Sequence, residues 1–200
     1  MIVGIVLIIS AFSLVMYNIN ESLNAGIKSR NMVSMITEYI DNSYASISSD
    51  YYPEEYYNSK MTGDSNYQYF SEDGLSFAGI LNIPELKINL PVCSDFSMKN
   101  LSNYPCIYSG NISDENIIIA AHKYDTHFGS IKLLDAGDRV MLRTLSGRNI
   151  IYEVFSVDII PGNKPDEMSA GDWDLTLFTC TRSGTDRIAV RCFRSSAALG

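Results

Sequence analysis

A succession of short segments rich in β-branched and aromatic residues constrains the fold of this chain more than any other feature. Glycine or proline stands between most of these segments, and no long helical pattern separates them. Many short strands without intervening helices are typical of a closed barrel or a sandwich. The segments are residues 77–83, 87–92, 116–122, 138–145, 149–160, 173–180 and 187–193. The sequence therefore predicts an all-β domain, with short helices only at about 97–102 and 128–134.

The first 17 residues contain no charged side chain and are apolar apart from one glycine, two serines and a tyrosine. A helix of this length spans about 26 Å, which is near the lower limit for crossing a bilayer. A cleaved signal peptide is the alternative, but no basic region precedes the run and no clear small-x-small site follows it. We therefore predict a transmembrane anchor at residues 1–17.

Residues 18–74 are predicted to connect this anchor to the β domain. Apolar residues recur at mostly helical intervals over 18–47, so we expect the membrane helix to continue outward. Residues 48–74 are rich in Tyr, Ser, Asn and Asp and show little apolar periodicity, which is typical of a linker. The β domain is then expected at residues 75–200.

Charge and cysteine spacing argue against two classes of function. The net charge is −8 at pH 7, whereas nucleic-acid binding needs clustered Lys and Arg for phosphate contacts. The four cysteines form no CxxC pair, and with only two histidines they form no familiar zinc spacing. Calcium binding by the acidic residues of 161–172 is less favoured than a solvated loop. We expect no nucleic-acid partner, no metal site and no cofactor.

Cys180 ends one β-like segment and is the best candidate for a reactive thiol. A short turn follows it, and Arg187 opens the next segment. Antiparallel pairing across this turn would bring the guanidinium near the sulfur, and a cation favours the nucleophilic thiolate. The alternative is that Cys180 is a small buried hydrophobe, as free cysteines usually are. Cys192 lies on the opposite strand face from Arg187 and is expected in the core.

His122 ends a continuous apolar run, at a place where a polar side chain can reach solvent or substrate. A nucleophilic thiol needs a proton donor and acceptor, which an imidazole supplies. A histidine after such a run is more often structural. The second histidine, His127, is assigned to a loop or the surface.

Taken together, these residues resemble the sortases, the membrane-anchored cysteine transpeptidases of Gram-positive bacteria. The segments that carry the resemblance are GILNIPELKINLPV at 79–92, IIIAAHKYDTHFGSIKLLDAGDRV at 117–140, TLFTC at 176–180 and the strand-opening Arg187. Ala121 departs from the pattern, because many members carry glycine before the histidine.

The resemblance implies a closed eight-stranded β-barrel with short helices, held outside the cell by the N-terminal helical anchor. It also implies cleavage of an LPxTG-like sorting signal between Thr and Gly, followed by transfer of the acyl group to an amine. Cys180 would attack the scissile carbonyl, His122 would move protons, and Arg187 would stabilise the oxyanion or hold the substrate backbone. The residues predicted to contact the substrate are Ala120, Ala121 and Thr179.

The expected partners are surface proteins with C-terminal sorting signals and the amine of a peptidoglycan precursor or a pilin. No second apolar stretch follows Phe193, which favours cell-wall anchoring over pilus assembly. A Cys-His hydrolase and an anchored binding module with an inert barrel remain alternatives. Arg182 and Arg191 are alternatives for the role of Arg187. Lys28 and Arg30 follow the anchor, and by charge alone they would place the barrel in the cytoplasm.

Overall fold

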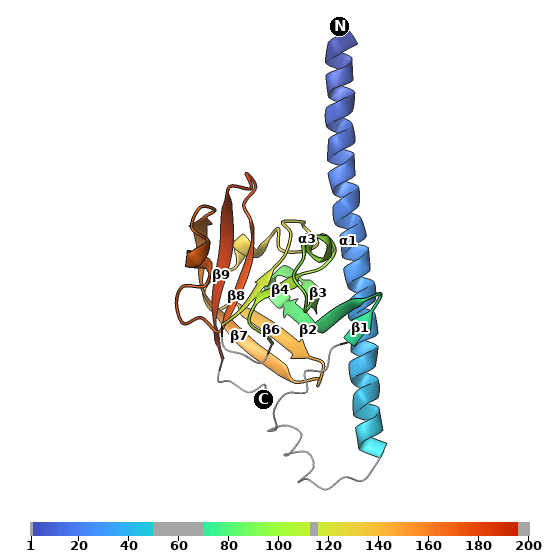
Figure 1. Ribbon diagram of the computed structural model, residues 1–200, viewed down its shortest axis with the longest axis vertical. Coiled ribbons are helices and arrows are strands. Elements are labelled where there is room, and N and C mark those ends of the chain that lie inside the picture. Colours follow the sequence, from blue (N-terminus) through green and yellow to red (C-terminus); the bar gives the residue numbers. More distant parts are fainter. Residues whose placement is uncertain (1, 50–69, 113–115, 196–200) are drawn as a thin grey trace.

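The computed structural model describes residues 2–49, 70–112 and 116–195. Helix α1 (Ile2–Ser49) runs without interruption for 48 residues, so the predicted outward continuation of the apolar helix is confirmed. Its N-terminal part stands clear of the rest of the molecule, and its C-terminal part lies along the barrel (Figure 1). The predicted linker falls largely on residues 50–69, which lie outside the described residues.

The N-terminal part of α1 is suited to a membrane. Among the described residues, α1 is the one helix with a stretch long and apolar enough to cross a bilayer, with a mean hydropathy of 1.9. None of that stretch is buried against the barrel, so it is not a core helix of a soluble domain. Large apolar side chains such as Ile8, Phe12 and Leu14 are more than half exposed. The helix is therefore a candidate membrane anchor.

The β-like segments form one sheet that closes on itself. Its strands are β1 (Phe70–Glu72), β2 (Leu75–Ile83), β3 (Ile88–Cys93), β4 (Cys106–Ser109), β5 (Ile117–Ala120), β6 (Arg139–Thr144), β7 (Asn149–Pro161), β8 (Leu175–Cys180) and β9 (Asp186–Arg194). Their order is β1-β2-β3-β4-β5-β8-β9-β7-β6, and an additional β2–β6 pairing closes the ring. Among the described strands β1 pairs only with β2, which leaves eight in the closed barrel. This confirms the predicted fold.

Two strands were not expected. β4 is only four residues long and lies between Pro105 and Gly110, so its sequence has too few residues to show a period. It is defined by pairing with β5 and by one parallel pair, Cys93 with Cys106. β1 lies within the segment that was assigned to the linker, and that assignment is wrong for residues 70–72.

The short helices fall largely where they were expected. Helix α3 (Met98–Leu101) begins after Ser97, whose hydroxyl accepts a hydrogen bond from the Asn100 N–H at 3.0 Å. The 3₁₀ helix η2 (Ile131–Leu133) lies within the second predicted patch. Two further 3₁₀ turns, η1 (Pro84–Leu86) and η3 (Pro165–Met168), each begin at a proline.

Successive side chains of β8 point alternately into the barrel interior and onto its outer face, part of which other residues cover. Leu175 and Leu177 point into the barrel core. Phe178 instead packs outside the barrel, where it joins Ile118, Met168 and neighbouring residues. Cys180 has the same parity as Phe178, so it also lies on the outer face.

Helix α1 covers another part of this outer surface. Its buried residues Met32, Ile36 and Ile40 pack in one cluster with Phe77 of β2 and Tyr104. Burial of three large side chains contributes several kcal/mol at about 25 cal/mol per Å² of apolar surface. The C-terminal half of α1 is thus an integral part of the folded unit rather than a free stalk.

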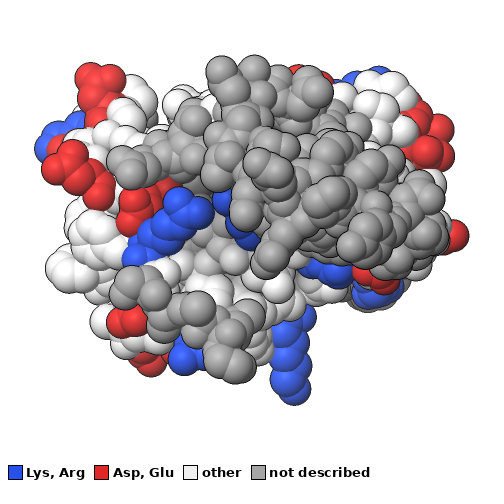
Figure 2. Space-filling view, turned by 90° about the horizontal axis from the view of Figure 1, so that it is seen from below, with Lys and Arg blue, Asp and Glu red and all other residues white. Residues whose placement is uncertain are grey.

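Charges at the barrel end farthest from the N terminus of α1 are mixed. Figure 2 shows described Lys and Arg side chains scattered among acidic ones on this face. Such a distribution, in a chain with net charge −8, does not suit phosphate-backbone binding.

Candidate active site

Cys180 is the most accessible thiol of the chain. It is half-buried at the end of β8, whereas Cys93, Cys106 and Cys192 are fully buried. Burial raises the pKa of Cys192 to about 12, so that thiol stays neutral. Cys192 lies in the barrel core, which confirms its predicted position. Among the described cysteines, Cys180 is therefore the one whose sulfur a substrate can reach.

Arg187 is placed directly opposite Cys180. The two residues are register partners in the antiparallel β8–β9 ladder. Arg187 Nη1 donates hydrogen bonds to the carbonyl oxygens of Gly184 at 3.2 Å and Asp186 at 3.1 Å. These bonds hold the guanidinium at the turn that follows Cys180.

His122 reaches the same end of the barrel from β5. β5 and β8 run parallel, with Ala120 paired to Phe178. The ladder continues past the strand end, because the Ala121 N–H donates to the Phe178 carbonyl at 3.1 Å. Extending this register to the next residues places His122 beside Cys180. By this extension of the register, the three residues that the sequence predicted as catalytic fall at the same end of the β5–β8–β9 part of the sheet.

The loop after His122 is held tightly. The Gly129 N–H donates to the Tyr124 carbonyl at 2.9 Å. A Cβ atom at Gly129 would lie 2.7 Å from the Lys123 carbonyl oxygen, so only glycine fits this approach. Lys123 Nζ donates to the Arg182 carbonyl at 2.9 Å and ties the loop to the β8–β9 turn. The imidazole is thus carried by a fixed segment.

Burial is the main influence on the charge of His122. Desolvation lowers the pKa of the imidazole below its usual value, and the nearby Lys123 ammonium lowers it further. The Glu21 carboxylate on α1 acts in the opposite direction. The net effect is a lowered pKa, so the neutral imidazole, the form that accepts a proton, is favoured at neutral pH.

His127 has a structural role. It lies in the loop, as predicted, but it is fully buried, and its assignment to the surface is wrong. Its Nε2 lies 3.2 Å from the Ser29 hydroxyl of α1. Burial lowers the pKa of His127 to about 4, so its ring is neutral under physiological conditions. The packing of α1 against this loop explains the burial.

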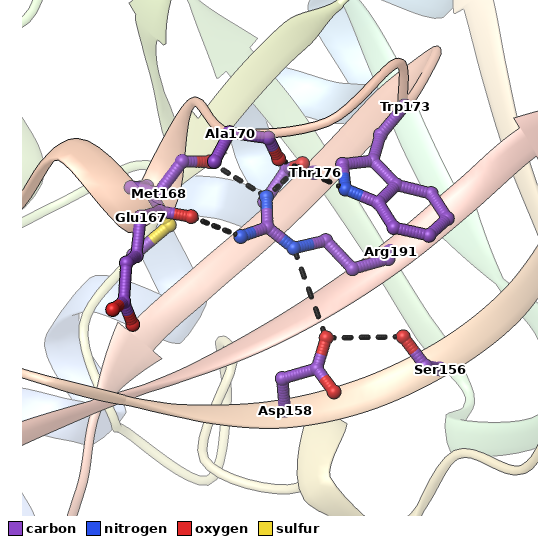
Figure 3. A network of polar contacts seen from close by, with 8 residues as sticks. All are labelled: Ser156, Asp158, Glu167, Met168, Ala170, Trp173, Thr176 and Arg191. Atoms are coloured by element: carbon purple, nitrogen blue, oxygen red, sulfur yellow. Dashed lines mark hydrogen bonds and ion pairs between the residues drawn. The ribbon is translucent and has the colours of Figure 1, made fainter.

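Arg191, the alternative candidate for the catalytic role of Arg187, has a structural role. Its buried guanidinium donates to the carbonyls of Met168 and Glu167, each at 2.6 Å, and to the Thr176 hydroxyl at 2.9 Å (Figure 3). Its Nε lies 3.9 Å from the Asp158 carboxylate. These contacts fasten η3 over the outer face of β8 and β9. Arg182, the other alternative, is exposed in the turn.

Replacement of Arg191 by lysine is expected to weaken the fold. An ammonium cannot match the planar guanidinium that serves three acceptors at once. The loss of charge-assisted bonds should lower the free energy of unfolding by about 2–3 kcal/mol. Thermal and chemical denaturation of the purified full-length protein would measure this change. Arg182→Lys is the matched control and should change stability by less than about 0.5 kcal/mol. Equal stability of the two variants would contradict the clamp.

The residues predicted to contact the substrate lie next to the catalytic positions but are buried. Ala120, Ala121 and Thr179 are 2%, 4% and 2% exposed. The Thr179 hydroxyl donates to the Ala121 carbonyl at 2.7 Å, a bond between the strand ends that carry His122 and Cys180. Their role in substrate binding stays a prediction, and the Thr179–Ala121 bond indicates a structural role at the two strand ends.

Tyr124 is a site residue that the sequence did not identify. Its ring lies 4.9 Å from the His122 ring, centroid to centroid, at an interplanar angle of 32°. The available signal was an aromatic residue two positions after the strand-ending histidine.

Among the residues that the structure describes, no group of three or more His, Cys, Asp or Glu side chains is arranged to hold a metal ion.

Comparison with known proteins gives the family. Residues 81–195 match the family model of the sortase domain. No curated protein sequence matches the chain significantly. Among solved structures, a Clostridium perfringens sortase D5 transpeptidase has a TM-score of 0.60 at 18% identity, covering 84% of this chain and 99% of that chain. A C. perfringens sortase C with the C-terminal cell wall sorting motif has a TM-score of 0.60 at 22% identity, covering 84% and 100%.

A third structure, a pilus-related sortase C of group B Streptococcus, has a TM-score of 0.52 at 26% identity and covers 60% of this chain and 67% of that chain. The structural matches agree with the closed barrel, and the family model spans more than half of the sequence. The chain belongs to the sortase family of cysteine transpeptidases.

Proposed function

We propose that this protein cleaves an LPxTG-like sorting signal between Thr and Gly and joins the new acyl end to an amine, with Cys180, His122 and Arg187 as the catalytic residues. The observation that carries the proposal is the strand register. It pairs Cys180 with Arg187 on one side and, by its extension from Ala120–Phe178, sets His122 on the other.

The roles follow from the chemistry of each group. The Cys180 thiolate attacks the scissile carbonyl, and the amine of the leaving glycine takes a proton from His122 as the C–N bond breaks. A thioacyl bond to Cys180 results. An incoming amine, deprotonated by His122, then attacks this thioester, so that an amide forms and the thiolate leaves. The Arg187 guanidinium donates to the oxyanion that develops in each step.

The sorting signal is proposed to bind along the outer face that carries Cys180, beside the part of that face that η3 covers. The segment at η3 is fixed beside this face by Arg191 and by the burial of Met168. Phe178 lies two residues before Cys180, and its ring contacts that of Tyr108 at 5.3 Å. These apolar groups suit the leucine and proline of such a signal. The structural relative that contains a cell wall sorting motif supports the same class of substrate.

A peptide panel tests the proposed reaction. The full-length protein would be incubated with sorting-signal peptides, with and without an amine acceptor, and the products identified by mass spectrometry. Transfer gives an amide with the added amine, whereas a hydrolase gives the free acid in both cases. Parallel reactions with a peptidoglycan-type amine and a pilin-type amine would show which of the two is the better acceptor. An absence of cleavage across the panel, in a protein whose Cys180 resists thiol-directed reagents, would support the binding-module alternative.

We also propose that the barrel lies outside the cell. The turn between β8 and β9 points toward the N-terminal side of α1 (Figure 1), so the catalytic end faces the side of the anchor. This orientation suits a substrate that is itself held at the membrane. Protease added to intact protoplasts should digest the barrel and leave a cytoplasmic control protein intact. A barrel that is protected until lysis would show the opposite topology.

A further inference from the structure

The loop that follows His122 is fixed on two sides. Phe128 is fully buried in the barrel core, and its N–H donates to the His122 carbonyl at 3.1 Å. His127, the residue before it, is also fully buried, but its ring contacts the anchor helix. His127 Nε2 lies 3.2 Å from the Ser29 hydroxyl of α1. The loop is thus held between the barrel interior and α1.

Helix α1 approaches this loop closely. Thr126 Oγ1 donates to the Ser22 carbonyl at 2.9 Å. A Cβ atom at Gly26 would lie 2.8 Å from the Thr126 methyl group, so a larger residue there would press against the loop. Further along the helix, Ser29 meets His127. The three helix residues are spaced by four and three positions, so they form one face of α1 against the loop.

The direction of the Ser29–His127 hydrogen bond follows from a second contact of the serine. Ser29 Oγ also donates to the Asn103 carbonyl at 3.1 Å, and a carbonyl oxygen can only accept. Because a hydroxyl has a single proton, the Ser29 oxygen is left to accept from the Nε2–H group of His127. The neutral His127 ring is therefore the Nε2–H tautomer. Ser29 joins α1, the His122 loop and the turn after α3.

Ring contacts continue from His127 to His122. The Tyr124 and His127 ring centroids are 5.6 Å apart, at an interplanar angle of 47°. The same Tyr124 ring lies 4.9 Å from the His122 ring, at 32°. The Tyr124 backbone is fixed as well, because its carbonyl accepts from the N–H groups of His127 and Gly129, each at 2.9 Å. A series of contacts thus leads from Ser29 on α1 to the His122 imidazole.

We propose that His127, fixed by Ser29 of α1, is a positioning residue of the active site, which holds the His122 imidazole in place through Tyr124. The inference rests on the proposed catalytic role of His122. Misplacement of a catalytic group by about 1 Å can cost about 10²-fold in rate, and packing against a fixed ring limits such movement. Helix α1, which lies outside the matched sortase domain of residues 81–195, would then support the active site as well as anchor the protein.

Two substitutions at His127 separate the hydrogen bond from the ring contact. His127→Phe keeps an aromatic ring against Tyr124 but loses the donor to Ser29, whereas His127→Ala loses both. The kcat for transfer of a sorting-signal peptide should fall by about 10–100-fold in His127→Ala. It should fall by about 2–10-fold in His127→Phe and in Ser29→Ala, the effect of one lost hydrogen bond. The KM for the peptide should change little, because His127 is fully buried and does not reach the substrate.

Ser34→Ala is the matched control for Ser29→Ala, because Ser34 is an exposed serine on the same helix. It should leave kcat unchanged. Cys192→Ala is the control for lost stability, because it truncates a buried side chain in the barrel core and should lower the free energy of unfolding without lowering kcat. Circular dichroism of each variant would confirm that α1 and the barrel are intact. If His127→Ala does not fold, His127→Phe and Ser29→Ala decide the question.

A second measurement observes the imidazole directly, by NMR of the full-length protein in nanodiscs with isotope-labelled histidine. The chain has only two histidines, so the His127 variants retain the signal of His122 alone. The wild-type His127 ring should show the Nε2–H tautomer. The His122 signal should shift or broaden in His127→Ala and Ser29→Ala, and it should coincide with that of the wild type in Ser34→Ala.

An unchanged His122 signal in the folded His127 and Ser29 variants would overturn the proposal. A shifted signal with a wild-type kcat would also overturn the positioning role, and so would a reduced kcat with an unchanged signal. The NMR measurement does not require turnover, so it judges His127 even if the wild-type protein transfers no sorting-signal peptide. That last result would instead count against the proposed function.

Discussion

Cys180→Ala is expected to abolish both cleavage and transfer, with a loss of more than about 10⁴-fold in kcat/KM. The thiolate forms the bond to the substrate, and no other described thiol is accessible at the strand end that carries Cys180. The side chain is small and half-buried on the outer face, so its truncation should leave the barrel folded. Peptide cleavage by the folded variant, measured by chromatography over long incubation, checks this result.

Cys192→Ala provides the matched control. It makes the same substitution on the neighbouring strand, but in the barrel core, where the high pKa of the thiol excludes a nucleophilic role. This variant should lose some stability through the small cavity and keep its activity. Thiol-directed reagents should label the wild type and Cys192→Ala equally and fail to label Cys180→Ala. Substantial turnover by folded Cys180→Ala would end the cysteine mechanism.

His122→Ala and Arg187→Lys should both reduce the transfer rate, but in different ways. His122 moves protons, so its loss should cost about 10²–10⁴-fold and change the shape of the pH profile. Arg187 is proposed to act through its charge and its N–H donors and not by transferring a proton. Its replacement by lysine should cost about 10²–10³-fold, as for an oxyanion donor, and keep the pH optimum. Transfer rates measured across pH distinguish the two roles.

Arg182→Lys is the control for the arginine. Its side chain is exposed in the turn, and only its backbone carbonyl has a defined task, as acceptor for Lys123. The rate should stay near that of the wild type. Near-normal activity in Arg187→Lys, together with collapse in Arg182→Lys, would show that the catalytic guanidinium comes from the turn. Arg191→Lys is not informative for this comparison, because the loss of its bonds to η3 is expected to destabilise the fold.

The barrel could be predicted largely from the sequence because most strands carry their own signal. Long strands such as β2 and β7 contain enough β-favouring residues to be predicted as strands from their own sequence. β4 could not be found in this way. Its four residues become a strand through their partners in β3 and β5, which lie elsewhere in the chain.

The candidate active site shows the same difference between what local sequence predicts and what depends on distant parts of the chain. Cys180 and Arg187 are joined by one hairpin, so parity and turn length sufficed to pair them. His122 follows β5 and Cys180 ends β8, which are neighbouring parallel strands, and here the family resemblance supplied the connection. The contacts of α1 with the His122 loop join residues about a hundred positions apart. Local periodicity contains no information on such pairs, which is why the burial of His127 and the position of Tyr124 were missed.

The most direct measurement of the central mechanism is the intact mass of the full-length protein during reaction with a sorting-signal peptide. The mass should rise by that of the acyl fragment, with the bond located at Cys180 by digestion. Addition of an amine should restore the original mass and release the new amide. Cleavage without any covalent adduct, or an adduct on a residue other than Cys180, would contradict the proposed mechanism.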